Sequence, residues 1–153
     1  MFKDIRIALI FSVVLLDIIG IGVIFPIIPD LLKEVGIDQT ASAAFWGGLL
    51  SSSYAFMQFV FSPTIGTLSD IFGRRPILLL ASLLLGIDYL LMGFAENILI
   101  LFIGRIIGGL AGGTIATGTA YLADISDTKD KKKNFAIIGA AFGLGFILGP
   151  IIG

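Results

Sequence analysis

Five apolar runs of about 20 residues constrain this chain more strongly than any other feature of the sequence. An α-helix rises 1.5 Å per residue, so about 19 residues reach roughly 28 Å, close to the ~30 Å hydrocarbon core of a bilayer. We therefore expect membrane-spanning helices at about 5–28, 43–66, 76–95, 98–122 and 135–153. The pattern predicts an all-α membrane protein with one transmembrane domain over residues 1–153.

The composition excludes several classes of protein. Hydrophobic residues make up 57% of the chain and charged residues only 14%, whereas a soluble domain carries about 25% charged residues. The net charge is −1 and the basic residues are scattered at the ends of the runs, which argues against a nucleic-acid partner. The sequence contains no cysteine and no histidine, so it offers no disulfide, no Cys/His metal site and no Ser-His or Cys-His catalytic pair. We expect neither an enzyme nor a metal protein, but a protein embedded in the lipid bilayer.

The basic residues predict the orientation of the spans. If the spans alternate in direction, one side carries Lys3, Arg6, Arg74, Arg75, Lys129, Lys131, Lys132 and Lys133, and the other carries only Lys33. Basic residues near span ends favour the cytoplasmic side, so we expect a cytoplasmic N-terminus and an outer position for Gly153. A cleaved signal peptide is the alternative for the first run, but that run is too long, contains Asp17 and lacks a small-residue cleavage site.

Three ionisable residues interrupt the apolar runs: Asp17, Asp88 and Arg105. Counted from the predicted span ends, all three lie about 18–20 Å from the cytoplasmic side. A charge at that depth is costly and normally faces a bundle interior or a watery cavity, so we expect Arg105 beside at least one carboxylate. Two interpretations stay open: an ion pair that only holds helices together, and a polar substrate cavity with a carboxylate that takes up a proton.

Two further polar residues lie inside the runs. Gln58 is expected either to offer a hydrogen bond in the cavity or to contact a neighbouring helix. Tyr89 follows Asp88 and points elsewhere on a helix, so ordinary packing is the favoured interpretation.

Glycines recur at helical spacing in the runs, and prolines lie where a span is expected to end or bend. The glycines at helical spacing are Gly104, Gly108, Gly109, Gly112 and Gly113 in the fourth run and Gly139, Gly143, Gly145, Gly149 and Gly153 in the fifth. Small residues four apart let membrane helices approach closely, and such faces serve either static packing or helix sliding. Proline lacks an amide donor, so we expect Pro26 and Pro29 to end the first span, and Pro63 and Pro150 to bend the second and fifth.

The connection between the second and third runs is dense in polar and turn residues. From Gly66 to Pro76 it reads GTLSDIFGRRP, with a glycine at each end of a short turn. Asp70 is expected either to cap a helix end or to pair with Arg74 or Arg75, and Pro76 suits the first turn of the third helix. We expect a charge-paired turn on the cytoplasmic face.

This connection resembles the G-x-L-x-D-x-x-G-R-R/K signature of the major facilitator superfamily. In the fourth run, Arg105 with Gly109 and Gly113 is similar to that superfamily's R-x-x-x-G motif. The residues Gly145, Gly149, Pro150 and Gly153 resemble the fifth-helix motif of its drug:proton antiporters, and residues 17–29 are similar to their first-helix motif. Segments 16–22, 72–76, 88–91 and 142–146 resemble the tetracycline efflux proteins within that group.

The resemblance implies a multi-pass protein of the cell inner (cytoplasmic) membrane. Such a protein exports a small-molecule drug, there a metal-chelated tetracycline, in exchange for a proton, and the proton gradient takes the place of a cofactor. By the same resemblance, Asp17, Asp88, Arg105 and Gln58 would serve proton coupling and substrate passage. A cytoplasmic gate would contain Gly66, Asp70, Gly73, Arg74 and Arg75.

The length departs from the family's pattern. Members have twelve spans in two halves around a central cavity, whereas this chain resembles the first five. We expect the N-terminal part of a larger transporter, truncated or split, whose C-terminal half is a missing partner. The alternatives are a proton-coupled multidrug or metabolite transporter of the same superfamily, and a membrane fragment or assembly factor that transports nothing. A scaffold would tolerate Asn or Leu at the three buried charges, whereas a coupled antiporter would not.

Overall fold

The computed structural model describes residues 5–153, so Lys3, which contributes to the predicted orientation, lies outside the described residues. Over those residues the chain forms helices joined by short connections and contains no strand, which confirms the predicted all-α fold. The helices are α1 (Ile5–Glu34), α2 (Thr40–Phe72), α3 (Arg74–Gly93), α4 (Ile98–Leu110), α5 (Thr114–Ile125) and α6 (Lys131–Ile152).

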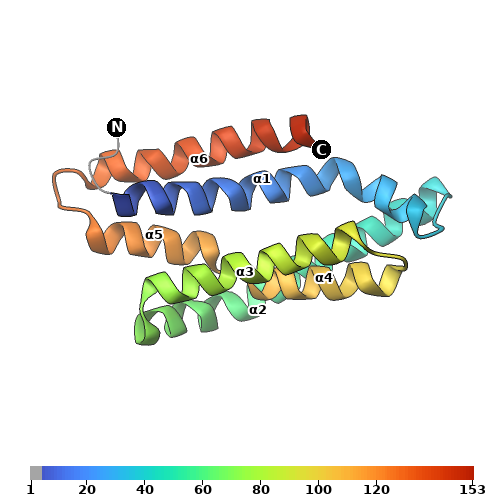
Figure 1. The fold of residues 1–153 in the computed structure, drawn as a ribbon, viewed down its shortest axis with the longest axis horizontal. Coiled ribbons are helices and arrows are strands. Elements are labelled where there is room, and N and C mark those ends of the chain that lie inside the picture. Colours follow the sequence, from blue (N-terminus) through green and yellow to red (C-terminus); the bar gives the residue numbers. More distant parts are fainter. Residues whose placement is uncertain (1–4) are drawn as a thin grey trace.

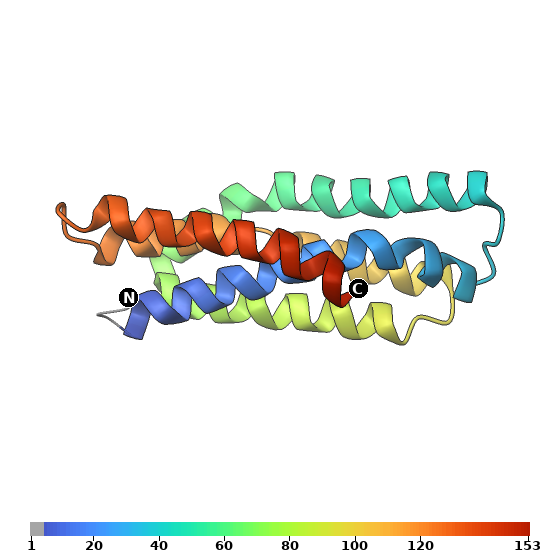
Figure 2. The same ribbon diagram turned by 90° about the horizontal axis from the view of Figure 1, so that it is seen from above.

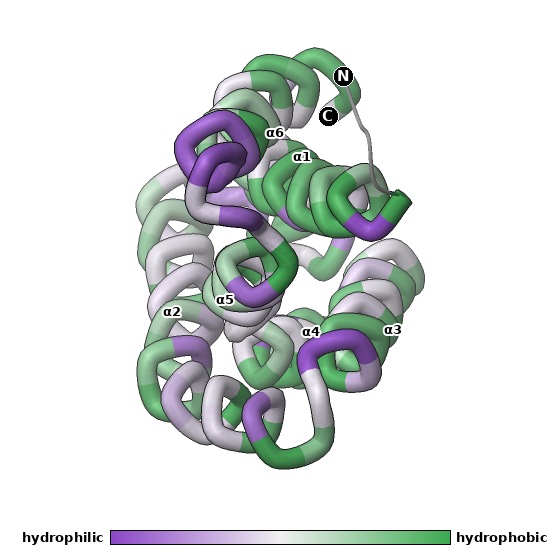
Figure 3. The backbone as a smooth tube through the Cα atoms, turned by 90° about the vertical axis from the view of Figure 1, so that its left-hand side faces the viewer, coloured by the Kyte–Doolittle hydropathy of each residue, from purple (hydrophilic) through white to green (hydrophobic). Residues whose placement is uncertain are grey.

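The helices form an elongated bundle with alternating directions (Figures 1 and 2). In Figure 1, α1, α3 and α6 run one way, whereas α2 and the rod formed by α4 and α5 run the other way. α1 and α6 begin, and α2 meets α3, at the same end of the bundle, which we call the basic end. Figure 3 looks onto this end and shows hydrophilic segments gathered there. The alternation is the one that the predicted topology requires; the membrane side of the basic end stays a prediction.

Four segments are long and apolar enough to cross a membrane: Ile5–Glu34, Arg74–Gly93, Ile98–Ile125 and Lys131–Ile152. They correspond to the first, third, fourth and fifth predicted spans. α2 covers the second predicted span and has 33 residues, but it is not among the four. Its serines at 51–53 and its Gln58 lower its hydropathy, so length alone supports a crossing by α2.

The fourth predicted span is interrupted, which the sequence analysis did not anticipate. α4 ends at Leu110 and α5 begins at Thr114. Between them the amide of Gly112 donates to the Gly109 carbonyl at 3.0 Å, and the amide of Thr114 donates to the Ala111 carbonyl at 3.2 Å. These three-residue spacings are the tighter pattern of a 3₁₀ turn rather than that of an α-helix.

The expectation that Pro26 and Pro29 end the first span is wrong, because α1 continues through both to Glu34. Both prolines are exposed, whereas Ile28 between them is buried. The lost amide donors therefore lie on the outer side of α1, and packing of its inner side carries the helix past them. Pro76 lies in the first turn of α3, as expected.

Glycines set how closely α1 and α6 approach. An added Cβ on Gly149 of α6 would lie 2.6 Å from the Cα of Gly22 in α1, and an added Cβ on Gly145 would overlap Ile18. Backbone-to-backbone contact of this kind needs small residues on both helices. In contrast, an added Cβ on Gly139 or Gly143 would meet nothing within the described chain, so only part of the predicted glycine face is packed.

Candidate functional site

Asp88 of α3 and Arg105 of α4 form a buried ion pair, joined by a hydrogen bond from Nη2 to the carboxylate. Asp88 is 0% exposed and Arg105 is 5% exposed. Arg105 therefore lies beside a carboxylate, as its position in an apolar run predicts. Inside a membrane-crossing bundle, such a pair keeps each charge from standing alone in an apolar medium.

Two glycines of α4 make room for this pair. An added Cβ on Gly104 would lie 3.0 Å from Asp88 Oδ1, and an added Cβ on Gly108 would overlap the same carboxylate. Their spacing in the sequence predicts a role in helix packing. The structure shows that they also seat a charged side chain.

Tyr54 of α2 completes this cluster, and the sequence analysis missed it. The guanidinium carbon of Arg105 lies 5.1 Å from the centre of the Tyr54 ring, within the range of a cation–π interaction. Tyr54 lies four residues before Gln58, so the two share one face of α2. That spacing was the only signal in the sequence, and an aromatic residue in an apolar helix is too common for it to stand out.

Asp17 of α1 is buried, and among the described residues Arg105 forms its ion pair with Asp88 rather than with Asp17. Asp17 is 6% exposed, and among residues 5–153 its Oδ1 has no hydrogen-bond partner. The structure thus joins Asp88, Arg105 and Tyr54 in one cluster and leaves Asp17 as a second buried acid outside it.

Tyr89 packs against α1, as the favoured interpretation expected. Its phenol fills the space beside Gly20, where an added Cβ would overlap the hydroxyl group. Tyr89 also packs against two of the buried hydrophobic clusters of the bundle.

A cavity of about 330 Å³ opens beside Arg105. Its polar lining comes from Ser51, Tyr54 and Gln58 of α2 together with Arg105, and apolar residues of α1 form the opposite wall. A second, more open cavity of about 710 Å³ continues past Gln58 toward α5. An apolar hollow with a few convergent polar groups suits a largely apolar small molecule.

Gln58 meets both expectations that the sequence left open. It lines the two cavities, and its Nε2 also donates to the Gly112 carbonyl at 2.9 Å. Within the described residues, no cluster of acidic side chains could hold a metal ion.

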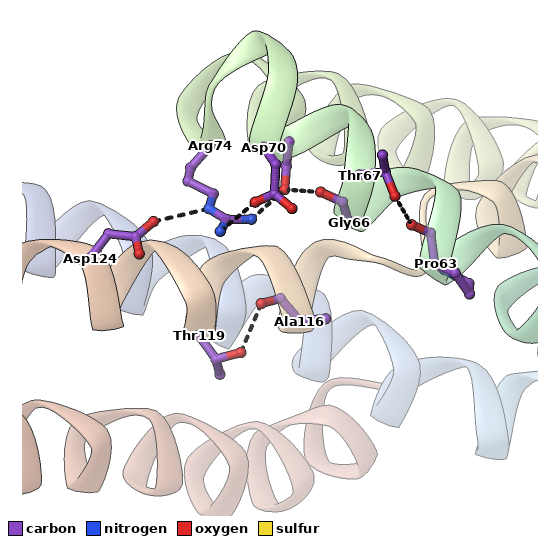
Figure 4. A network of polar contacts seen from close by, with 9 residues as sticks. Pro63, Gly66, Thr67, Asp70, Arg74, Ala116, Thr119 and Asp124 are labelled. Carbon is purple, nitrogen blue, oxygen red and sulfur yellow. Dashed lines mark hydrogen bonds and ion pairs between the residues drawn. The ribbon is translucent and has the colours of Figure 1, made fainter.

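A polar network lies at the basic end, centred on Arg74 (Figure 4). Its guanidinium pairs with Asp70 at 2.6 Å and with Asp124 of α5 at 3.0 Å, and it donates to the Ser69 hydroxyl at 2.6 Å. Of the two roles left open for Asp70, pairing is the one observed. Asp124 was missed, because an acid at a span end is ordinary in any membrane protein.

The predicted gate loop is shorter than expected. Gly66 and Asp70 lie inside α2 and Arg74 begins α3, so Gly73 alone separates the two helices. Gly73 has φ 94°, a left-handed conformation that favours glycine, and one such residue reverses the chain without a longer loop. Arg75 does not join the Arg74 network but lines a groove between α1 and α3.

The remaining predicted motif residues lie at helix contacts. An added Cβ on Gly109 would overlap the backbone of Tyr54, and one on Gly113 would overlap Ile65 of α2. Pro150 lies within α6 beside the contact with Gly22.

Membrane-length helices around a buried ion pair and a cavity define a polytopic membrane protein. The chain belongs to the Major Facilitator Superfamily, whose family model matches residues 10–153.

Among curated relatives, the Tetracycline resistance protein, class B, of Escherichia coli is 43% identical over 148 residues, covering 97% of this chain and 36% of that protein. The Quinolone resistance protein NorA of Staphylococcus aureus is 36% identical over 141 residues, covering 92% of this chain and 35% of that protein. The crystal structure of the human organic anion transporter MFSD10 (TETRAN) matches with a TM-score of 0.83 and 27% identity, covering 99% of this chain and 42% of that chain. This chain thus spans little more than a third of the length of these curated relatives.

Proposed function

We propose that this chain is the N-terminal part of a proton-coupled drug efflux antiporter of the tetracycline type. The observation that carries the proposal is the buried pair of Asp88 and Arg105 beside a cavity between membrane-length helices. A bundle that needed only stability would gain more from apolar side chains at these positions, because burying two charges costs desolvation energy. The relatives add the substrate class, since two of them are named for drug resistance.

The buried groups suggest a division of labour in coupling. A proton on Asp88 would cancel the charge that holds Arg105, so Arg105 would be free to shift toward the cavity or toward Tyr54. The Asp17 Oδ1 has no hydrogen-bond partner in the described residues, so no donor there competes with a proton for that oxygen. We infer that both acids carry protons during transport. We also infer that the position of Arg105 beside the cavity changes with the protonation of these acids.

The network around Arg74 is proposed as the cytoplasmic gate. Arg74 connects Asp70 of α2 to Asp124 of α5, so it ties the turn between α2 and α3 to the end of the fourth span. Both acids are more than half exposed, so water can screen and release these pairs easily. Such a contact can open and close at little cost in each cycle.

The rest of the proposal follows the predicted topology and the relatives. The protein would lie in the cell inner membrane with a cytoplasmic N-terminus, would use the proton gradient without a cofactor, and would need a C-terminal half to enclose the cavity. The substrate is proposed to be a tetracycline. The similarity to a quinolone resistance protein makes a quinolone the second candidate within the same mechanism.

Drug uptake into everted membrane vesicles tests the proposal. Vesicles should contain this chain alone, or this chain joined to whatever its downstream reading frame encodes, and should receive tetracycline with Mg²⁺ or a fluoroquinolone. We expect uptake by the longer protein only, driven by a proton gradient and abolished by a protonophore. Uptake of the quinolone but not of tetracycline would refute tetracycline as the substrate and would still support proton-coupled efflux. Uptake of neither compound by either protein would favour the non-transporting alternative.

A further inference from the structure

The interruption at residues 111–113 divides the fourth span into two halves, and each half is anchored to α3 by its own ion pair. α4 is tied to α3 through the ion pair between Arg105 and Asp88. α5 is tied to the turn between α2 and α3 through the ion pair between Asp124 and Arg74. The site near the cavity and the network at the basic end therefore hold opposite sides of the same interruption.

Within the described chain, the interruption leaves the Gly112 carbonyl without a helical amide donor, and the side chain of Gln58 bonds to it instead. The Gln58 Nε2 donates to the Gly112 carbonyl at 2.9 Å, supplying a donor where regular helical bonding is broken. The contact is also close, because an added Cβ on Gly112 would overlap the Gln58 side chain. Backbone that leaves the α-helix at membrane depth is tolerated only where such partners satisfy it.

Gln58 is also accessible to anything that enters the cavities. It lines the cavity beside Arg105 and the larger one that reaches Gly112, Ile115 and Ala116. The Gln58 side chain thus borders the space for a small molecule while its amide contacts the interrupted backbone. A ligand that took a hydrogen bond from Nε2 would remove it from the Gly112 carbonyl.

We propose that residues 111–113 are a hinge in the fourth span and that Gln58 is the positioning residue that holds it in the observed conformation. A ligand in the cavity that competes for the Gln58 amide releases the hinge, so α5 tilts against α4. Because α5 carries Asp124, this tilt pulls on Arg74 at the basic end. The ligand-dependent part of this inference rests on the proposed function, whereas the hinge itself does not.

Spin-label distances across the hinge test the proposal. The sequence contains no cysteine, so Leu99→Cys on α4 and Thr119→Cys on α5 can be labelled without removing others. We expect one narrow distance distribution for the chain in lipid nanodiscs. Gln58→Met, which keeps a similar shape without a donor, should broaden it or shift it by several ångströms. Gly112→Ala should do the same from the other side of the contact.

Two controls separate the hinge from general damage. Ser53→Ala removes a hydroxyl that bonds only within α2, to the Leu50 carbonyl, and should leave the distance unchanged. Labels at Leu90→Cys on α3 and Leu99→Cys on α4 lie on the side of the hinge that holds the Asp88–Arg105 pair, so their distance should not move in Gln58→Met. An unchanged hinge distance in both Gln58→Met and Gly112→Ala overturns the proposal, as does a change of equal size in the α3–α4 pair.

Adding a drug to the labelled chain tests the ligand-dependent release of the hinge separately from the hinge itself. Tetracycline with Mg²⁺, added to the unsubstituted background, should shift the distribution across the hinge toward that of Gln58→Met and should have no further effect in Gln58→Met itself. If Gln58→Met moves the distance and the drug does not, the hinge stands and its release by tetracycline is refuted.

Discussion

At the scale of the residue, the pair of Asp88 and Arg105 is the feature most sensitive to substitution. Both side chains are almost fully buried, so neither can turn to water when its partner is removed. Breaking a buried pair costs about 3–5 kcal/mol, because it leaves an unpaired charge in an apolar interior. Removing both partners restores much of that loss, because no unpaired charge is left.

The difference between removing one partner and removing both gives the first prediction. Arg105→Leu should lower the free energy of unfolding by about 3–5 kcal/mol, and adding Asp88→Leu to it should recover at least half of the loss. The measurement is reversible denaturation in mixed micelles followed by helical circular dichroism. Arg75→Leu, at an exposed arginine outside the Arg74 network, is the matched control and should change stability by less than about 0.5 kcal/mol. A double variant that is no more stable than Arg105→Leu would contradict the pairing.

At the scale of the element, the approach of α1 and α6 depends on glycine in a position-specific way. Gly149 lies against the backbone of Gly22, whereas Gly143 on the same helix meets nothing in residues 5–153. The two glycines therefore offer a test in which helix propensity is the same and packing differs.

Gly149→Ala should destabilise the chain by about 1–3 kcal/mol, because the added methyl group forces α1 and α6 apart. Gly143→Ala should be neutral or should stabilise by up to about 1 kcal/mol through helix propensity. Thermal unfolding of the two variants side by side provides the comparison. Equal effects would mean that the α1–α6 contact is not formed as described.

At the scale of the whole molecule, the basic end is predicted to face the cytoplasm. Single cysteines at Lys129→Cys and Asp38→Cys lie at opposite ends of the bundle. A membrane-impermeant maleimide should label Lys129→Cys only in everted vesicles and Asp38→Cys only in intact cells. This prediction also tests the crossing by α2, because Asp38 precedes that helix; labelling of both sites from the same side would refute the alternating topology.

Sequence patterns anticipated much of this bundle for clear physical reasons. Hydropathy sets the length of a helix that can cross a bilayer, and an isolated charge at depth demands a partner, so the helices and the pairing of Arg105 were predictable. Hydropathy does not record interruptions, however. The run at 98–122 has no charged residue except Arg105, so its hydropathy gives no sign of the interruption. The contact between Gln58 and Gly112 is visible only in the fold.

Other features depended on neighbours that a single sequence does not show. Pro26 and Pro29 look like terminators, yet packing on the opposite side of α1 carries the helix through them. Tyr54 and Asp124 are ordinary residues for their positions and gain meaning only because Arg105 and Arg74 lie beside them. The roles of Asp17, Asp88, Arg105, Gln58 and the Arg74 network in transport all stay predictions.

The central claim is that the buried acids exchange protons for drug, and proton movement in drug-loaded vesicles measures this most directly. Everted vesicles should contain the protein extended by its downstream reading frame. When tetracycline with Mg²⁺ is added, drug should enter the lumen and protons should leave it, so the lumen should become more alkaline. Asp17→Asn and Asp88→Asn should each reduce this exchange at least tenfold. Asp30→Asn, which removes an exposed acid on α1 that pairs with Lys33, should leave it unchanged. Proton exchange that persists at full rate in both Asp17→Asn and Asp88→Asn would contradict the claim.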